Sequence, residues 1–157
     1  MFNESRDLAD INFYIANCIY KPSYISLQTA LSYYGLIPEA VANITSVATL
    51  KTALFENSVG VFSYKKIKDS FFTGFEHIKF DGEKNVLFAS LEKALLDFLY
   101  LYPFYNTEKS IYHLRLNEDI LTETVDFDKL DILLSNFKSK NLEKRIRLLK
   151  KVYSLSI

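Results

Sequence analysis

The sequence has little of what several specialised protein classes require. Its 157 residues include one cysteine, which excludes an internal disulfide and a cysteine-rich metal knuckle. The 19 basic and 19 acidic side chains cancel, so no nucleic-acid-binding charge covers the whole surface, although a local basic face is possible. Four glycines and three prolines leave most of the chain open to regular structure. Cys18 lies among apolar residues, and we expect a buried, unreactive thiol.

Long apolar runs are also missing. The first ten residues are mostly polar or charged, which does not match a secretory signal. The apolar stretch at 94–105 contains Asp97 and Pro103 and is too short and interrupted to span a bilayer. We therefore expect a cytoplasmic protein with no membrane partner. With 49% apolar and 15% aromatic residues, the chain can bury one substantial core.

The spacing of apolar residues and turn formers predicts an α+β fold. Helices are expected at 8–20, 27–34 and 91–102, with Ser26 and Ser90 as the N-caps of the last two. Runs rich in β-branched and aromatic residues predict strands near 44–49, 52–56, 59–66, 74–80 and 84–89. Further elements are expected as helical turns at 38–42 and 68–72, a hairpin turn at Asp81-Gly82, and helices at 108–114, 127–137 and 141–154. The predicted fold is a small mixed or antiparallel sheet of about five strands, flanked by N-terminal and C-terminal helices in one domain spanning 1–157.

Three segments point to a known family. They read PSYISLQTALSYYGLIPE at 22–39, ITSVATLKTALFENSVGVFSYKKIK at 44–68, and ASLEKALLDFLYL at 89–101. In order and spacing they resemble the C-terminal domain of AbiEi-type antitoxins, which are transcriptional regulators of phage-defence (abortive infection) toxin–antitoxin systems. The resemblance spans a core at 10–102, and 103–157 forms a C-terminal helical extension that is only loosely matched.

The resemblance implies an antitoxin-like interaction domain that counteracts a nucleotidyltransferase-like toxin, either directly or indirectly. Members usually begin with a winged helix that binds the promoter, and the few residues before the first matched segment do not provide one. Members often have several arginines after the Thr-Ser-Val motif, whereas this stretch contains only Lys51. We therefore expect protein interaction to matter more than promoter recognition in this chain.

The C-terminal helix predicts the clearest charged surface. Lys140, Lys144, Arg147 and Lys151 are spaced four, three and four residues apart, which places them on one helical face. This face could dock an acidic partner protein or weakly bind a nucleic-acid backbone, and the second possibility is the alternative function: a transcriptional regulator acting through a basic helix. It could equally be a solvated face balanced by the acidic stretch at 117–131.

Two further groups are candidate partner contacts. Glu92, Lys93 and Asp97 match the Glu-Lys-Ala-Leu-Leu-Asp part of the third segment and could present charge to the toxin. Alternatively, Lys93 and Asp97 form a weak surface pair one turn apart, and Glu92 stabilises the helix N-terminus. Tyr33 is expected to point away from the apolar face of its helix, and with Glu39 it frames the turn that follows; both could contact a partner or simply pack.

Catalysis is not predicted. His77 and His113 lie in separate elements, without the ligand spacing of a zinc site or a nucleophile motif. Glu56, Glu76 and Lys79 could contribute to a nuclease-like site at strand ends, but nothing in their spacing singles them out. We expect no enzyme activity, no metal and no cofactor, and the sequence does not indicate an oligomeric state.

Overall fold

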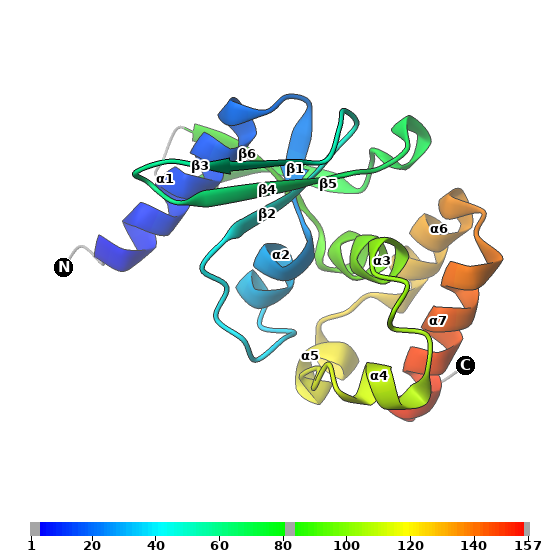
Figure 1. Cartoon of the computed structure of the whole chain (residues 1–157). Helices are drawn as coiled ribbons and strands as arrows, with labels where there is room; N and C mark the ends of the chain where they lie inside the picture. Colours follow the sequence, from blue (N-terminus) through cyan, green and yellow to red (C-terminus); the bar gives the residue numbers. More distant parts are fainter. Residues whose placement is uncertain (1–3, 81–83, 156–157) are drawn as a thin grey trace.

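A computed structural model describes residues 4–80 and 84–155 of the chain. It contains a mixed six-stranded sheet with helices on both faces, and further helices beyond one of these layers (Figure 1). The fold is a single α+β domain, as the sequence predicts. The expected hairpin turn at Asp81-Gly82 lies outside the described residues.

The strands follow the order β3-β4-β2-β1-β6-β5 across the sheet. Their bounds are Ser23–Ile25 (β1), Ile44–Ala48 (β2), Ala53–Glu56 (β3), Val61–Lys66 (β4), Phe75–Phe80 (β5) and Lys84–Ala89 (β6). Strand β1 pairs antiparallel with β2 and parallel with β6, and β2 pairs parallel with β4. The two edge strands, β3 and β5, each form an antiparallel hairpin with their neighbour.

Seven α-helices and one short 3-10 helix accompany the sheet in the described ranges. They are Glu4–Ile19 (α1), Leu27–Tyr33 (α2), Asp69–Phe71 (η1), Leu91–Leu101 (α3), Glu108–Tyr112 (α4), Glu118–Glu123 (α5), Phe127–Phe137 (α6) and Lys140–Val152 (α7). None of the helices in the described ranges is long and apolar enough to cross a membrane.

The alternation of side chains along the strands assigns a helix layer to each face of the sheet. Tyr64 on β4 lies on the same face as Ser46 on β2, and its hydroxyl donates to the Ala16 carbonyl of α1 at 2.5 Å. Tyr24 on β1 lies on the opposite face with Val47, and its hydroxyl reaches α3. Helix α1 therefore covers one face, and α3 packs beneath the other (Figure 1).

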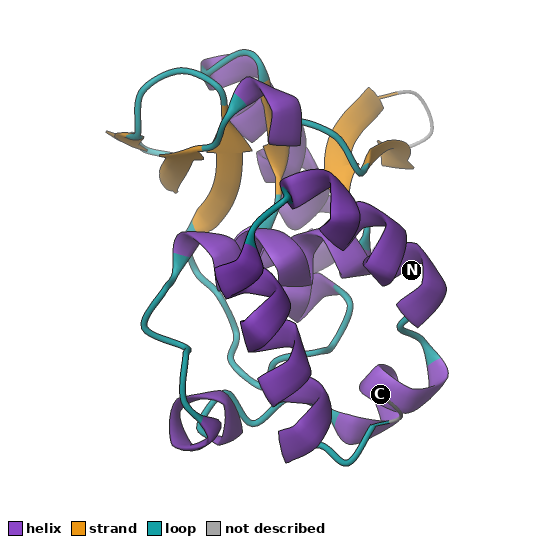
Figure 2. Ribbon diagram, turned by 90° about the vertical axis from the view of Figure 1, so that its right-hand side faces the viewer, coloured by secondary structure: helices purple, strands orange, loops and turns teal. Residues whose placement is uncertain are grey.

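Helix α3 is enclosed on all sides. Every residue from Leu91 to Leu99 is buried, because the sheet and α2 contact one side of the helix and α6 and α7 contact another. Figure 2, viewed from the side of α6 and α7, shows the strands gathered at one end and helices filling the rest of the domain. Arg145 of α7 donates to the Leu99 carbonyl at 3.1 Å, which ties the C-terminal helices to α3.

Most of the sequence-predicted elements are confirmed within one to four residues, and the exceptions have physical causes. Strand β1 was not expected, because its three residues follow Pro22 and are too few to show alternation. Helix α5 forms in the acidic stretch, where Asn117 caps it by accepting from the Ile120 amide at 3.2 Å. The expected helical turn at 38–42 is wrong: these residues form bends and irregular structure.

Candidate functional site

Two charged residues of α3 that the sequence offers as partner contacts, Lys93 and Asp97, lie in the core. Lys93 Nζ lies 2.5 Å from Asp97 Oδ1, and both side chains are fully buried. The same ammonium donates to the Phe71 carbonyl at 2.8 Å and lies 4.5 Å from the centre of the Phe137 ring. The expectation of a surface pair is therefore wrong, because α6 and η1 cover the polar side of α3.

Two hydroxyl groups also donate hydrogen bonds to the buried carboxylate of Asp97. The Tyr24 hydroxyl donates to Asp97 Oδ2 at 2.7 Å, and Ser26 Oγ donates to the same oxygen at 2.9 Å. Ser26 was expected to cap α2, but its side chain makes no capping bond because it is committed to Asp97. The following residue, Leu27, has a φ of 61°, a left-handed conformation that is uncommon for a non-glycine residue. The network therefore joins β1, the start of α2, and α3.

Burial controls the electrostatics of this network. It raises the pKa of Asp97, and the nearby ammonium and hydroxyl donors oppose that change. It lowers the pKa of Lys93, which the Asp97 charge opposes, and it raises the pKa of the Tyr24 hydroxyl well above its ordinary value. Perturbed groups often mark active sites, but none of these side chains reaches the surface, so no substrate can contact them in this conformation.

The aliphatic part of Lys93 is held by a close backbone approach. Gly74 has a φ of +76°, and a Cβ built on it would lie 2.8 Å from Lys93 Cγ and 2.9 Å from Cδ. The Gly74 carbonyl also accepts from the Ser90 amide at 3.1 Å. Ser90 caps α3 as expected, with its hydroxyl accepting from the Lys93 amide at 3.2 Å.

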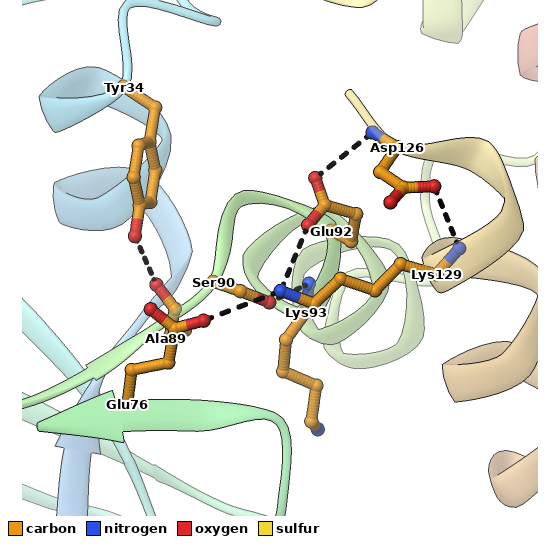
Figure 3. Close-up of polar contacts among 8 residues, drawn as sticks. All are labelled: Tyr34, Glu76, Ala89, Ser90, Glu92, Lys93, Asp126 and Lys129. Carbon is orange, nitrogen blue, oxygen red and sulfur yellow. Dashed lines mark hydrogen bonds and ion pairs between the residues drawn. The ribbon is translucent and has the colours of Figure 1, made fainter. Parts of the chain in front are cut away.

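Glu92 also lies inside the protein rather than on a docking surface. Its side chain is 7% exposed and forms an ion pair with Lys129 of α6 at 3.4 Å. The Asp126 amide donates to the other carboxylate oxygen at 3.3 Å. Lys129 also contacts Glu76 of β5 at 3.4 Å, so one ammonium bridges two acids from different elements (Figure 3). This expected partner contact is therefore a structural link between α3, α6 and the sheet.

The C-terminal helix α7 presents the charged face that the sequence predicts. Lys140, Lys144, Arg147 and Lys151 are all exposed, whereas Leu142, Ile146 and Leu149 are buried against the domain. Ser139 caps the helix by accepting from the Leu142 amide at 3.2 Å.

Acidic residues neutralise part of this face. The Arg147 guanidinium lies 3.7 Å from Glu143 on the same helix, and Lys151 contacts Glu108 of α4. Of the acidic stretch at 117–131, Asp131 reaches α7, where it lies 3.5 Å from Lys150. No ion pair of Lys140 or Lys144 is present among the described residues, so these two exposed ammonium groups are available to a partner.

The remaining candidates are scattered. Tyr33 is 48% exposed, and its ring also packs against Phe13 and Phe88, so it is only partly available. Glu39 is exposed and pairs with Arg115 at 3.1 Å. Within residues 4–80 and 84–155, neither side chain forms a hydrogen bond or ion pair with the α7 face. The Glu39–Arg115 pair could not be predicted from the sequence, because 76 positions separate the two residues.

The cysteine and histidines form no metal centre in the described parts of the chain. Cys18 is exposed, which corrects the expectation of a buried thiol. It lines a hollow of about 440 Å³ between α1 and the β5–β6 hairpin together with His77, whereas His113 lies at a different hollow. Between residues 4–80 and 84–155, no group of three or more histidine, cysteine, aspartate or glutamate side chains is placed to hold a metal ion.

Comparison with known proteins provides no relative. No family model matches the chain, and neither do any curated proteins or solved structures.

Proposed function

We propose that this chain is an antitoxin-like interaction domain of the AbiEi type, which counteracts a nucleotidyltransferase-like toxin in the cytoplasm and acts by binding rather than catalysis. The observation that supports it most is the way the three family-like segments meet. Tyr24 and Ser26 come from the first segment, and Lys93 and Asp97 come from the third.

The second segment is tied to the same place. The Thr45 hydroxyl of β2 donates to the Ser26 carbonyl at 2.7 Å, and the Thr45 amide donates to the Thr29 hydroxyl at 2.8 Å. The residues that carry the resemblance therefore belong to one connected structural unit. If the three segments resembled the family only by chance, we would have no reason to expect polar contacts to connect them.

In this proposal the buried network holds the fold, and the toxin contacts surface residues outside it. The exposed face of α7 is the strongest candidate, because Lys140 and Lys144 can meet acidic groups of a partner. This assignment moves the expected contact from Glu92, Lys93 and Asp97 to the C-terminal helix.

Co-expression tests the proposal. A nucleotidyltransferase-like toxin that arrests bacterial growth is expressed with and without this chain, and growth is followed while both proteins are verified as soluble. We expect the chain to relieve the arrest. Continued arrest with both proteins soluble, for toxins from several such systems, would contradict an antitoxin role.

A variant locates the contact. Replacement of Lys140, Lys144, Arg147 and Lys151 by Gln should reduce the relief of growth arrest, because it removes the charges offered to the partner. The matched control replaces four exposed lysines elsewhere, namely Lys21, Lys66, Lys68 and Lys79, by Gln. Equal loss in both variants would show that overall charge, and not the α7 face, is responsible.

The same face supports a second candidate, a nucleic-acid-binding regulator. Four exposed cations on one helix can neutralise backbone phosphates, and binding of this kind weakens with salt by a slope of about 0.9 per phosphate contact. The affinity for double-stranded DNA, measured at several salt concentrations, should then show a slope that falls in the Gln variant of α7 and not in the control. Absence of binding at low ionic strength would exclude this candidate.

A further inference from the structure

The two edges of the sheet differ in how they are protected. Edge strand β5 exposes Glu76, His77 and Lys79, and its Glu76 is tied to Lys129 of α6. Charged side chains and covering elements are the usual means by which sheet edges avoid pairing with other strands. Edge strand β3 reads Ala-Leu-Phe-Glu, so it has one charge, at its last residue, and no proline.

The hairpin that contains β3 also exposes apolar side chains. Leu54 is 68% exposed, Val59 in the adjoining turn is 50% exposed, and Leu50 just before the strand is 49% exposed. Phe55 points to the other face, where its ring packs against Tyr20 at 5.6 Å between ring centres. The exposed edge therefore combines unpaired backbone groups with an apolar side chain at its centre.

The hairpin geometry shows which backbone groups are free. The Asn57 amide donates to the Gly60 carbonyl at 3.0 Å, which makes this pair hydrogen-bonded. Hydrogen-bonded and non-hydrogen-bonded pairs alternate along an antiparallel ladder, so Phe55 and Ala53 bond to β4. The N–H and C=O groups of Leu54 and Glu56 consequently point away from the sheet. Their natural partner is another extended backbone.

We propose that a second copy of this chain occupies the edge, so that two β3 strands pair antiparallel about a two-fold axis. A pairing centred on Leu54 lets the two Leu54 residues exchange two backbone hydrogen bonds and places their side chains on the same face. This interface is independent of the antitoxin role and of the α7 face.

The charges at the two ends of the strand favour this antiparallel arrangement. Lys51 is exposed before β3, and Glu56 is exposed at its end. Antiparallel pairing brings the Lys51 end of one copy to the Glu56 end of the other, and Glu56 then faces the neutral Thr52. Parallel pairing would instead place like charges side by side at both ends, which is unfavourable.

Sedimentation equilibrium of the full chain, from about 1 µM to about 1 mM, tests the proposal over the range of weak association. We expect a monomer–dimer equilibrium. Leu54→Lys should weaken dimerisation at least about tenfold, because the introduced ammonium groups would lie directly opposite each other. The matched control is Ile132→Lys on α6, where the parent side chain is 67% exposed but belongs to a helix, whose backbone cannot extend a sheet; it should dimerise like the unmodified chain.

Cross-linking tests the register. Hydrogen-bonded antiparallel partners have Cα atoms about 5.5 Å apart, so two thiols at this position lie within reach of a short bismaleimide cross-linker. Leu54→Cys in a Cys18→Ser background should form a covalent dimer with this reagent, and Ile132→Cys in the same background should not. A chain that stays monomeric over the whole range, equal dimerisation of the Leu54→Lys variant, or no preferential cross-linking at position 54 would overturn the proposal. If the unmodified chain is monomeric and Leu54→Lys loses binding to the toxin, the proposed dimer would also be overturned. The β3 edge would then be the binding site for the toxin.

Discussion

Helices α3 and α7 each contain an acid and a base four residues apart, yet the two pairs have opposite surroundings. Lys93 and Asp97 lie 2.5 Å apart with both side chains 0% exposed. Glu143 and Arg147 lie 3.7 Å apart, with side chains 39% and 69% exposed. The spacing is the same, and the difference comes from what covers each helix. Sequence spacing therefore identifies a pair of charges but not whether the pair can contact a partner.

The energetic roles differ as well. A buried pair has lost its hydration, so each charge depends on the other and on nearby donors such as Tyr24 and Ser26. An exposed pair keeps its water and contributes about 0–1 kcal/mol. Removal of one charge of the α3 pair is therefore costly because it leaves the other buried without a partner, whereas the charges of α7 remain available for binding.

The largest expected effect is on α3. Lys93→Met should lower the free energy of unfolding by about 3–5 kcal/mol, because it leaves the Asp97 charge buried without its partner. The matched change on α7, Arg147→Met, should alter the unfolding free energy by no more than about 0.5 kcal/mol. Urea denaturation measures both. Similar losses for the two variants would show that the buried and exposed pairs matter equally for stability.

A smaller loss is expected from crowding the buried lysine. Gly74→Ala should destabilise the fold by about 1–2 kcal/mol through its left-handed conformation and by about 1–3 kcal/mol more through overpacking against Lys93. Gly35 has a similar φ of +79° and no heavy atom within 4 Å of a built Cβ, so Gly35→Ala isolates the conformational cost. Thermal and urea unfolding of both variants gives the difference. If Gly35→Ala costs as much as Gly74→Ala, close packing around Lys93 is not important.

The buried pair also predicts a pH dependence. The raised pKa of Asp97 means that its contribution to stability is fully present below pH 3.8 and is lost as the pH rises through its folded value. The lowered pKa of Lys93 gives a contribution that is complete above pH 10.5 and is lost as the pH falls through its folded value. The pair therefore favours folding least at intermediate pH.

The variant Lys93→Met/Asp97→Asn provides the reference, because it removes both titrations and keeps an amide oxygen that can accept from Tyr24 and Ser26. The stability of the unmodified chain minus that of this variant should rise from neutral pH toward acid pH and also toward alkaline pH. Urea midpoints across the pH range measure this difference. A difference that is constant with pH, or greatest near neutrality, would contradict the assigned shifts.

Local pattern predicted most of the fold, because it depends on neighbours in sequence. Helices α3 and α6 and strand β6 lie within one residue of their expected ranges, and Ser90 caps α3 as expected. Strand β1 has only three residues and depends on pairing with β2 and β6, which come much later in the chain. No local signal could reveal it.

The candidate site was less predictable for the same reason. The α7 face depends on spacing within one helix, and the structure keeps Lys140, Lys144, Arg147 and Lys151 exposed. The burial of Lys93 depends on η1 and on α6, which follows it by about thirty residues. The two hydroxyl partners of Asp97 lie 71 and 73 positions away. When elements that come later in the chain cover the polar side of a helix, the residues of that helix alone do not distinguish it from an amphipathic surface helix.

The charged face of α7 should have the smallest effect on stability and the greatest effect on binding. Replacement of Lys140, Lys144, Arg147 and Lys151 by Gln should change the free energy of unfolding by no more than about 1 kcal/mol, because surface ion pairs and the helix dipole each contribute little. Lys151 and Arg147 lose their contacts with Glu108 and Glu143, and both pairs are exposed.

Urea denaturation of this variant, beside Lys93→Met, measures the contrast directly. Retained stability together with lost growth rescue would mean that α7 acts through a partner and not through the fold. A loss as large as that of Lys93→Met would place the α7 charges among the groups that hold the domain together. Reduced rescue could then be explained by unfolding, and the basic face would no longer support either proposed function.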